Sequence, residues 1–517
     1  MAADIPSLLD AIRIKRPVLA RLLDKEGKKT LGKFAKNFES TSKFNDKSIQ
    51  DRFDLIRITA SYVEGLLGKE IAEKLRVRLA SNANLLTANH HCANISDLPV
   101  QGTIAFALSE KTDAVVVVFA FGDIPLNNSR YPRGILFAND IKLPVFPDKW
   151  KNTLVSVAPA FTAEFVHKAI QRAEKLLNEG QITCKQFDTS KFFLQTMYLN
   201  HKVLSCKSYS DQAVIISNIV WKKLFAEDAA LHNLELVHLE IEKIVAEILI
   251  LDLDNKQSLA YQMFFNNSLL WNLLNELDGK NGCWCEEKLK NLTLDNFQDN
   301  SDSDSSVGSG TVFFWGIDTK GRRIPLYLTQ ENHYELYLTG ISDSSEKFCL
   351  AFTPESIKDA LKKKLIISSL FTSFAVVSFA RGYKCYGGFM QVDYLTEMRN
   401  GLARALANSN LPEWAEIVRS IETENYCTGM IFALFSSNAD DISPAGAVEI
   451  ASNGGFTEEE LDKISSISLE DSTLFGLPRI YRTVFRPDER TEELSSITSM
   501  DIYNYKKDNF IIISGDK

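Results

Sequence analysis

Residues 114–121 are Ala-Val-Val-Val-Val-Phe-Ala-Phe, an uninterrupted apolar run in which β-branched side chains dominate. Such a run predicts a β-strand that is covered on both faces, as in a parallel sheet. Upstream, the short apolar segment over 84–88 predicts a second buried strand. Between the two, Asp97 and Pro99 fit the N-cap and the first turn of a helix. Strand, helix and strand at this spacing predict a βαβ unit with parallel strands.

Outward from this unit the chain is mainly helical in pattern. Apolar residues three or four positions apart predict an N-terminal helical layer over 5–79 and a helix over 161–177. Turn residues at 318–321 separate two apolar runs and predict a β-hairpin. We therefore predict a mixed α/β fold with a partly parallel sheet, an N-terminal helical layer and a helical insertion. An α+β arrangement is the alternative.

The length of 517 residues exceeds what one hydrophobic core usually supports, so several parts are expected. The stretch 295–310 is rich in Ser, Asp and Gly, which predicts a flexible acidic loop. The predicted parts are an N-terminal helical layer (1–82), an α/β segment with the candidate site (83–180), a mostly helical region (181–294), this loop (295–310) and a C-terminal α/β region that packs on the first (311–517).

Composition excludes several classes of partner. The formal net charge is −9 and no dense run of Lys or Arg is present, so we expect no nucleic-acid binding. No stretch reaches the 18 or so apolar residues of a membrane span, and charges interrupt the first apolar segment, so we expect neither a membrane protein nor a signal peptide. Eight scattered cysteines without a secretory signal favour the reducing cytoplasm.

Polar loops follow both strands of the βαβ unit. Parallel strands end at the same edge of a sheet, so side chains from the two loops are expected to lie close together. Histidine exchanges protons near neutral pH, and arginine binds carboxylates and phosphates. The predicted site residues in these loops are Asn89, His90, His91, Asp123, Asn127, Asn128, Arg130 and Arg133.

These residue types favour an enzyme that acts on a small anionic metabolite, with group transfer as the reaction class. His90 or His91 would be the general base, and Asp123 would orient a histidine. The asparagines would bind polar atoms of the substrate, and the arginines its negative charge. The alternative is a structural role, in which the histidines cap the strand end and the asparagines form turns.

Two further residues are predicted to bind substrate. Arg323 follows the tip of the predicted hairpin, where it either binds an anion or lies in solvent. Gln391 follows Gly387-Gly388, and these glycines permit close approach of the backbone to a ligand. The two glycines are expected to form a turn between two helices.

A different function is predicted from two Glu-x-x-His pairs, Glu164 with His167 and Glu235 with His238. This spacing places metal ligands on one helix face in di-iron and di-manganese bundles, so a di-metal oxidase or oxygenase is an alternative. The alternation over 234–242 fits a strand equally well, and a strand would direct the second pair to opposite faces. A non-catalytic interaction protein is the other alternative. The sequence determines neither a cofactor nor the oligomeric state.

Overall fold

The computed structural model describes residues 4–40, 43–45, 47–93, 95–110, 114–291, 309–331, 335–438 and 441–515. The predicted loop at 295–310 therefore lies outside the described residues, except for Ser309 and Gly310. None of the described helices is both long enough and apolar enough to cross a lipid bilayer.

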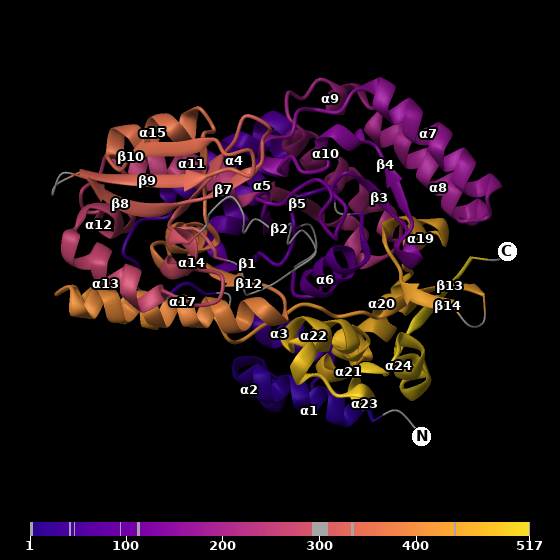
Figure 1. Ribbon diagram of the computed structural model, residues 1–517. Coiled ribbons are helices and arrows are strands. Elements are labelled where there is room, and N and C mark those ends of the chain that lie inside the picture. The colour runs from indigo at the N-terminus through magenta and orange to yellow at the C-terminus, as the bar shows by residue number, and fades with distance from the viewer. Residues whose placement is uncertain are drawn as a thin grey trace.

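A four-stranded parallel sheet forms the centre of the molecule (Figure 1). Its strand order is β12-β1-β2-β5, and every neighbouring pair is parallel. The helix α6 connects β1 to β2, which confirms the predicted βαβ unit. These elements are β1 (Asn84–Leu86), α6 (Asp97–Ala107), β2 (Val115–Ala120), β5 (Glu235–Glu240) and β12 (Lys384–Tyr386).

Side chains of β2 alternate between two large hydrophobic clusters, and every residue of this strand is buried. Val116 and Val118 face a cluster that includes α6 and α10, whereas Val115 and Val117 face one that includes α4, α5 and α11. Helices therefore cover both faces of the sheet, which explains the continuous apolar run. The covering helices are α4 (Phe53–Leu67), α5 (Lys69–Ser81), α10 (Tyr209–Trp221) and α11 (Ile241–Asp252).

The two ends of the chain pack together. Figure 1 shows the C-terminal helices beside the first three helices, with α1 against α22 and α3 against α20. The sequence pattern predicted the N-terminal helices and missed most of the C-terminal ones. These helices are α1 (Ile5–Lys15), α2 (Pro17–Glu26), α3 (Leu31–Ser40), α18 (Pro412–Arg419), α19 (Ala447–Ser452), α20 (Glu458–Ser466), α21 (Leu469–Thr473), α22 (Leu477–Val484), α23 (Glu492–Ser495) and α24 (Ser499–Tyr505).

Besides α10 and α11, the described part of the region predicted to be mostly helical (181–294) contains five helices; α7 precedes this region, and α15 lies in the region 311–517. The helix α7 matches the helix predicted over 161–177. These helices are α7 (Ala163–Asn178), α8 (Cys184–Phe193), α9 (His201–Leu204), α12 (Leu259–Phe265), α13 (Asn267–Leu277), α14 (Glu286–Lys290) and α15 (Pro354–Lys362).

Small sheets surround the central one, and their strand pairs are antiparallel except for β13 with β15, which is parallel. The predicted hairpin is present, because β6 and β7 pair across the turn at 318–321. A strand, β12, was not predicted and comes before the two glycines, so Gly387 and Gly388 join a strand to α17 and not two helices. The remaining elements are β3 (Gly134–Leu136), β4 (Lys142–Pro144), β6 (Phe314–Ile317), β7 (Arg323–Pro325), β8 (Tyr327–Glu331), β9 (Glu335–Ile341), β10 (Lys347–Ala351), β11 (Ile366–Ser368), α16 (Leu370–Phe374), α17 (Phe389–Asn408), β13 (Ala433–Asn438), β14 (Asp441–Pro444) and β15 (Ile511–Ser514).

Candidate functional site

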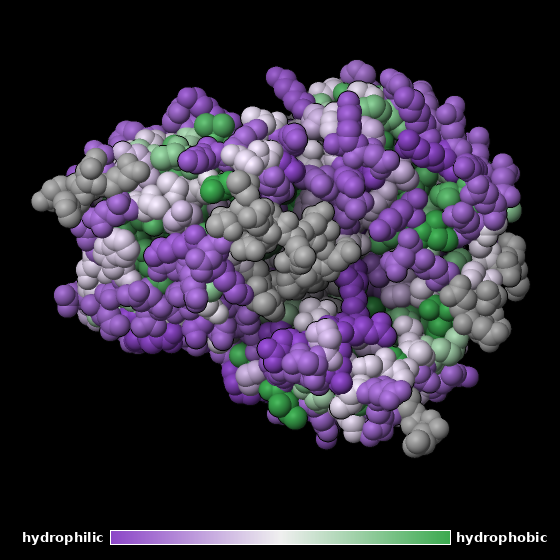
Figure 2. Space-filling model, viewed as in Figure 1, coloured by the Kyte–Doolittle hydropathy of each residue, from purple (hydrophilic) through white to green (hydrophobic). Residues whose placement is uncertain are grey.

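A cavity of about 1200 Å³ lies at the carboxyl edge of the central sheet. Its lining includes Thr87 after β1, Phe121 after β2 and Gly388 after β12. The helices that follow the neighbouring strands β1 and β12 pack mainly on opposite faces of the sheet, α6 on one and α17 on the other. Ligands of open α/β sheets bind at this kind of position. Figure 2 shows the surface hollowed beside the segment that carries α22, with hydrophilic residues along the rim.

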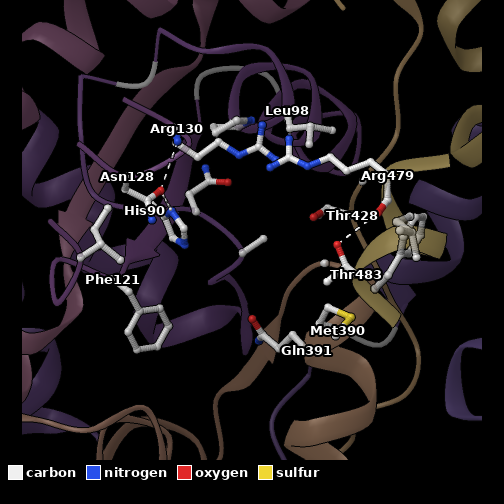
Figure 3. A pocket seen from close by; sticks show the side chains of 18 of the residues that line it. His90, Leu98, Phe121, Asn128, Arg130, Met390, Gln391, Thr428, Arg479 and Thr483 are labelled. Carbon is white, nitrogen blue, oxygen red and sulfur yellow. Dashed lines mark hydrogen bonds between the residues drawn. The ribbon is translucent and has the colours of Figure 1, made fainter. Parts of the chain in front are cut away.

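His90 lies at the centre of this edge. The backbone of His90 extends the pairing of β1 with β2, because it forms a parallel β-bridge with Phe121. The Nδ1 atom of His90 lies 2.8 Å from Oδ1 of Asn128, and the backbone N–H of Arg130 donates to the same oxygen at 3.1 Å. Because that oxygen only accepts, Nδ1 of a neutral His90 carries the proton and Nε2 carries the lone pair. Figure 3 shows the His90 ring pointing into the cavity.

The neighbouring residue, His91, has the opposite environment. It is fully buried and does not line the cavity. Its Nε2 atom lies 3.1 Å from both the backbone oxygen and the hydroxyl of Ser210, and its ring stacks on His238 with the centroids 5.4 Å apart. Burial lowers the pKa of His91, although the charge of Glu240 opposes this shift. His91 therefore belongs to the packed interior and does not share the cavity with His90.

Asp123 lines the cavity next to Arg323. Burial raises the pKa of Asp123, whereas the charges of Arg323 and His90 and a hydrogen bond from the Trp315 side chain lower it. The Arg323 guanidinium lies 3.9 Å from the Asp123 carboxylate and stacks on the Trp315 ring at 4.5 Å. The side chain that orients His90 is therefore Asn128, while Asp123 supplies negative charge nearby.

Beneath Asp123 lies Glu242, a carboxyl that the sequence did not single out. It is buried and accepts hydrogen bonds from the backbone N–H groups of Gly122 and Asp123. Burial raises the pKa of Glu242 well above its ordinary value, and the charges of Asp123 and Glu240 add to this rise. Glu242 thus fixes the loop that follows β2.

Two amide side chains line the cavity from buried positions. Asn89 donates to the Thr103 hydroxyl at 3.0 Å, and Gln391 donates to the Thr87 hydroxyl at 2.6 Å. Gly387 makes the second contact possible, because a Cβ atom there would lie 1.9 Å from the Gln391 Oε1 atom. These contacts fix the amides relative to the ends of β1 and β12.

The two arginines predicted to bind substrate in the loop after β2 lie in different places, and only one of them lines the cavity. Arg130 lines the cavity and forms an ion pair with Asp97 at 3.2 Å. Arg133 is buried away from it, where Nε donates to the Phe146 backbone oxygen and the guanidinium pairs with Asp148. Asn127 is exposed and does not line the cavity. Neither Arg133 nor Asn127 is therefore in position to contact a ligand there.

The cavity also contains residues that the sequence analysis missed. Arg16 comes from the junction of α1 and α2, Lys280 from the loop after α13, and Arg479 from α22. No local motif marks these three residues. They meet only because distant helices fold over the sheet edge, so one sequence offered no signal for them.

The arrangement required for a di-metal centre is not formed. Glu235 and His238 lie on the strand β5, so the strand alternative for this segment is the correct one. Because the two residues are three positions apart on a strand, their side chains point to opposite faces of the sheet. Glu164 and His167 are exposed on α7, where Glu164 pairs with Lys168. Within the described part of the chain, no three His, Cys, Asp or Glu side chains gather as metal ligands. The di-metal hypothesis therefore loses its structural premise.

Comparison of the chain with family models, curated proteins and solved structures gives no match in any of the three. The geometry of this cavity is therefore the basis for assigning a function to the chain.

Proposed function

We propose that this chain is an enzyme that transfers a group to or from a small anionic metabolite, with His90 as the general base. One observation carries the proposal: the hydrogen bond between Nδ1 and Asn128 fixes the tautomer and the orientation of the His90 ring, which points into the cavity (Figure 3). A fixed tautomer and a fixed ring orientation are what a general base requires.

In the proposed step, Nε2 accepts the proton of a hydroxyl or amine on the acceptor substrate while that oxygen or nitrogen bonds to the group carried by the donor substrate. The bond between this group and its leaving atom breaks, and the imidazolium returns the proton to the leaving atom. The imidazolium that forms keeps its Nδ1–H bond to Asn128, and the nearby Asp123 carboxylate attracts its charge. The cavity arginines would hold the negative charge of the substrate, and the amides of Asn89 and Gln391 line the same space. The cytoplasm is part of the proposal, because none of the eight cysteines forms a disulfide in the described structure, as expected in a reducing compartment.

The test begins with a thermal-shift screen of phosphorylated and carboxylated metabolites on the purified chain. Compounds that stabilise the protein are then incubated with it, alone and in pairs, and conversion is followed by NMR. Replacing His90 by Gln keeps a hydrogen-bonding side chain but removes the base, so the rate should fall by about 10²- to 10⁴-fold.

His201→Gln is the matched control, because His201 is exposed on α9 and does not line the cavity. Its rate should equal that of the unmodified chain. Equal rates for the His90→Gln protein would refute the role of His90, and ligand binding without any conversion would favour a binding protein over an enzyme.

A further inference from the structure

The wall of the cavity carries more positive than negative charge. Its described lining residues include four arginines and two lysines against three aspartates, in a chain whose formal charge is −9. Two of the aspartates form ion pairs with arginines of the same wall, Asp97 with Arg130 and Asp123 with Arg323. The excess of cations is therefore local, and it is opposite in sign to the charge of the whole protein.

Arg16 is the most unusual of these cations. Its side chain lines the cavity although the residue is only 7% exposed, and its Nε atom has no hydrogen-bond partner among the described residues. Asp393 and Glu397 on α17 act on it through charge, but neither forms an ion pair with it within the described chain. A buried guanidinium without direct acceptors is costly, because its lost hydration is not replaced. An anion in the cavity would supply those acceptors.

Arg130 and Arg479 form a second cationic feature. Figure 3 shows their guanidinium groups extending toward each other from opposite sides of the cavity. Arg130 has Asp97 as a partner, whereas Arg479 forms no ion pair with a carboxylate of the described residues. Two guanidinium groups that face each other repel unless an anion lies between them. Their orientation thus fits a ligand that bridges both.

Two helix N-termini add to the positive electrostatic potential in the cavity. Residues of the first turns of α6 and α17 line the cavity, among them Leu98 and Met390. These helices have 11 and 20 residues, so their dipoles direct partial positive charge at a ligand.

We infer that this wall, formed by Arg16, Arg130 and Arg479 with the two helix N-termini, binds a phosphoryl dianion on the substrate. A phosphate monoester carries close to two negative charges at neutral pH and presents three acceptor oxygens in different directions. A single carboxylate has half that charge and lies in one plane, so it neutralises one arginine and leaves the other. The inference rests on the proposed function, because it assigns the class of metabolite on which His90 would act.

The test is calorimetric titration of the full chain with inorganic phosphate at low ionic strength and about pH 8, where phosphate is mainly a dianion. Arg479→Gln and Arg16→Gln should each weaken phosphate binding by about tenfold or more, because each removes a charge-assisted hydrogen bond. Arg479 is exposed, so its replacement does not threaten folding. Circular dichroism and thermal unfolding check the Arg16 variant.

Arg482→Gln is the matched control, because Arg482 lies on the same helix, α22, and outside the cavity. Its phosphate affinity should remain that of the unmodified chain. Equal weakening in the Arg482 and Arg479 variants would overturn the inference, and so would no phosphate binding by the unmodified chain. Tighter binding of succinate than of phosphate, with the same dependence on Arg479, would overturn it in favour of a dicarboxylate.

A His90→Gln protein separates this inference from the proposed function. It should bind phosphate as the unmodified chain does. Loss of conversion with intact phosphate binding supports both proposals, whereas intact conversion with arginine-dependent phosphate binding supports the phosphoryl site and refutes the role of His90.

Discussion

Replacing His238 by Leu should make the protein less sensitive to acid. His238 is fully buried on β5, and neither of its ring nitrogens has a hydrogen-bond partner among the described residues. Burial lowers the pKa of His238 well below its ordinary value, and the charge of His91 adds to that effect. In the folded protein the imidazole therefore stays neutral under mildly acidic conditions.

Unfolding returns the pKa of His238 to about 6.5. Below that pH the unfolded chain binds a proton that the folded chain does not, so the free energy of unfolding falls as the pH falls. The loss is about 1.4 kcal/mol per pH unit for one histidine that stays neutral in the fold. Between about pH 7.5 and about pH 5 it amounts to about 2 kcal/mol for His238 alone.

The assay is urea unfolding at several pH values and constant ionic strength, followed by tryptophan fluorescence. Trp221 reports on this region, because it lies on α10, which packs against β5. The free energy of unfolding of the Leu variant should change with pH by about 2 kcal/mol less than that of the unmodified chain. Groups such as Glu242 titrate in both proteins and cancel in the comparison. Parallel pH curves for the two proteins would refute the reasoning, and His167→Leu, at an exposed position, should leave the curve unchanged.

Two further predictions concern stability and use urea unfolding at neutral pH. Gly387→Ala should lower the free energy of unfolding by about 1–3 kcal/mol, because the new Cβ atom would collide with Gln391. Gly388→Ala has no neighbouring atom within 4 Å and should have a smaller effect, so equal losses would contradict the first prediction. Arg381→Met should lower the free energy of unfolding by about 3–5 kcal/mol, because it leaves the buried carboxylate of Asp252 without its bidentate partner. Lys363→Met breaks an exposed pair and should cost less than about 1 kcal/mol, and similar losses for both would contradict the burial argument.

The proximity of the two loops could be predicted from the sequence because the fold itself dictated it. The loops after β1 and β2 had to meet at one edge because parallel strands end together, and His90, Asp123, Asn128 and Arg130 all line the cavity there. The sequence could not show which of the two adjacent histidines, His90 or His91, points into the cavity. The direction of two adjacent side chains depends on the register of the strand end and on the helices packed against it.

The sequence by itself indicated the parallel βαβ unit, because the β-branched apolar run over 114–121 is typical of a strand covered on both faces and a helix pattern separates it from the strand upstream. It also determined the hairpin of β6 and β7 through the turn at 318–321.

Only the tertiary structure decided the rest. β12 has three residues, too few for any periodicity to be seen, and its place beside β1 depends on pairing with a distant segment. Arg16 and Arg479 reach the cavity from opposite ends of the chain, because α1 packs on α22 over the sheet edge. Contacts between distant segments are set by the packing of whole faces, and this information is not contained in any local stretch of sequence.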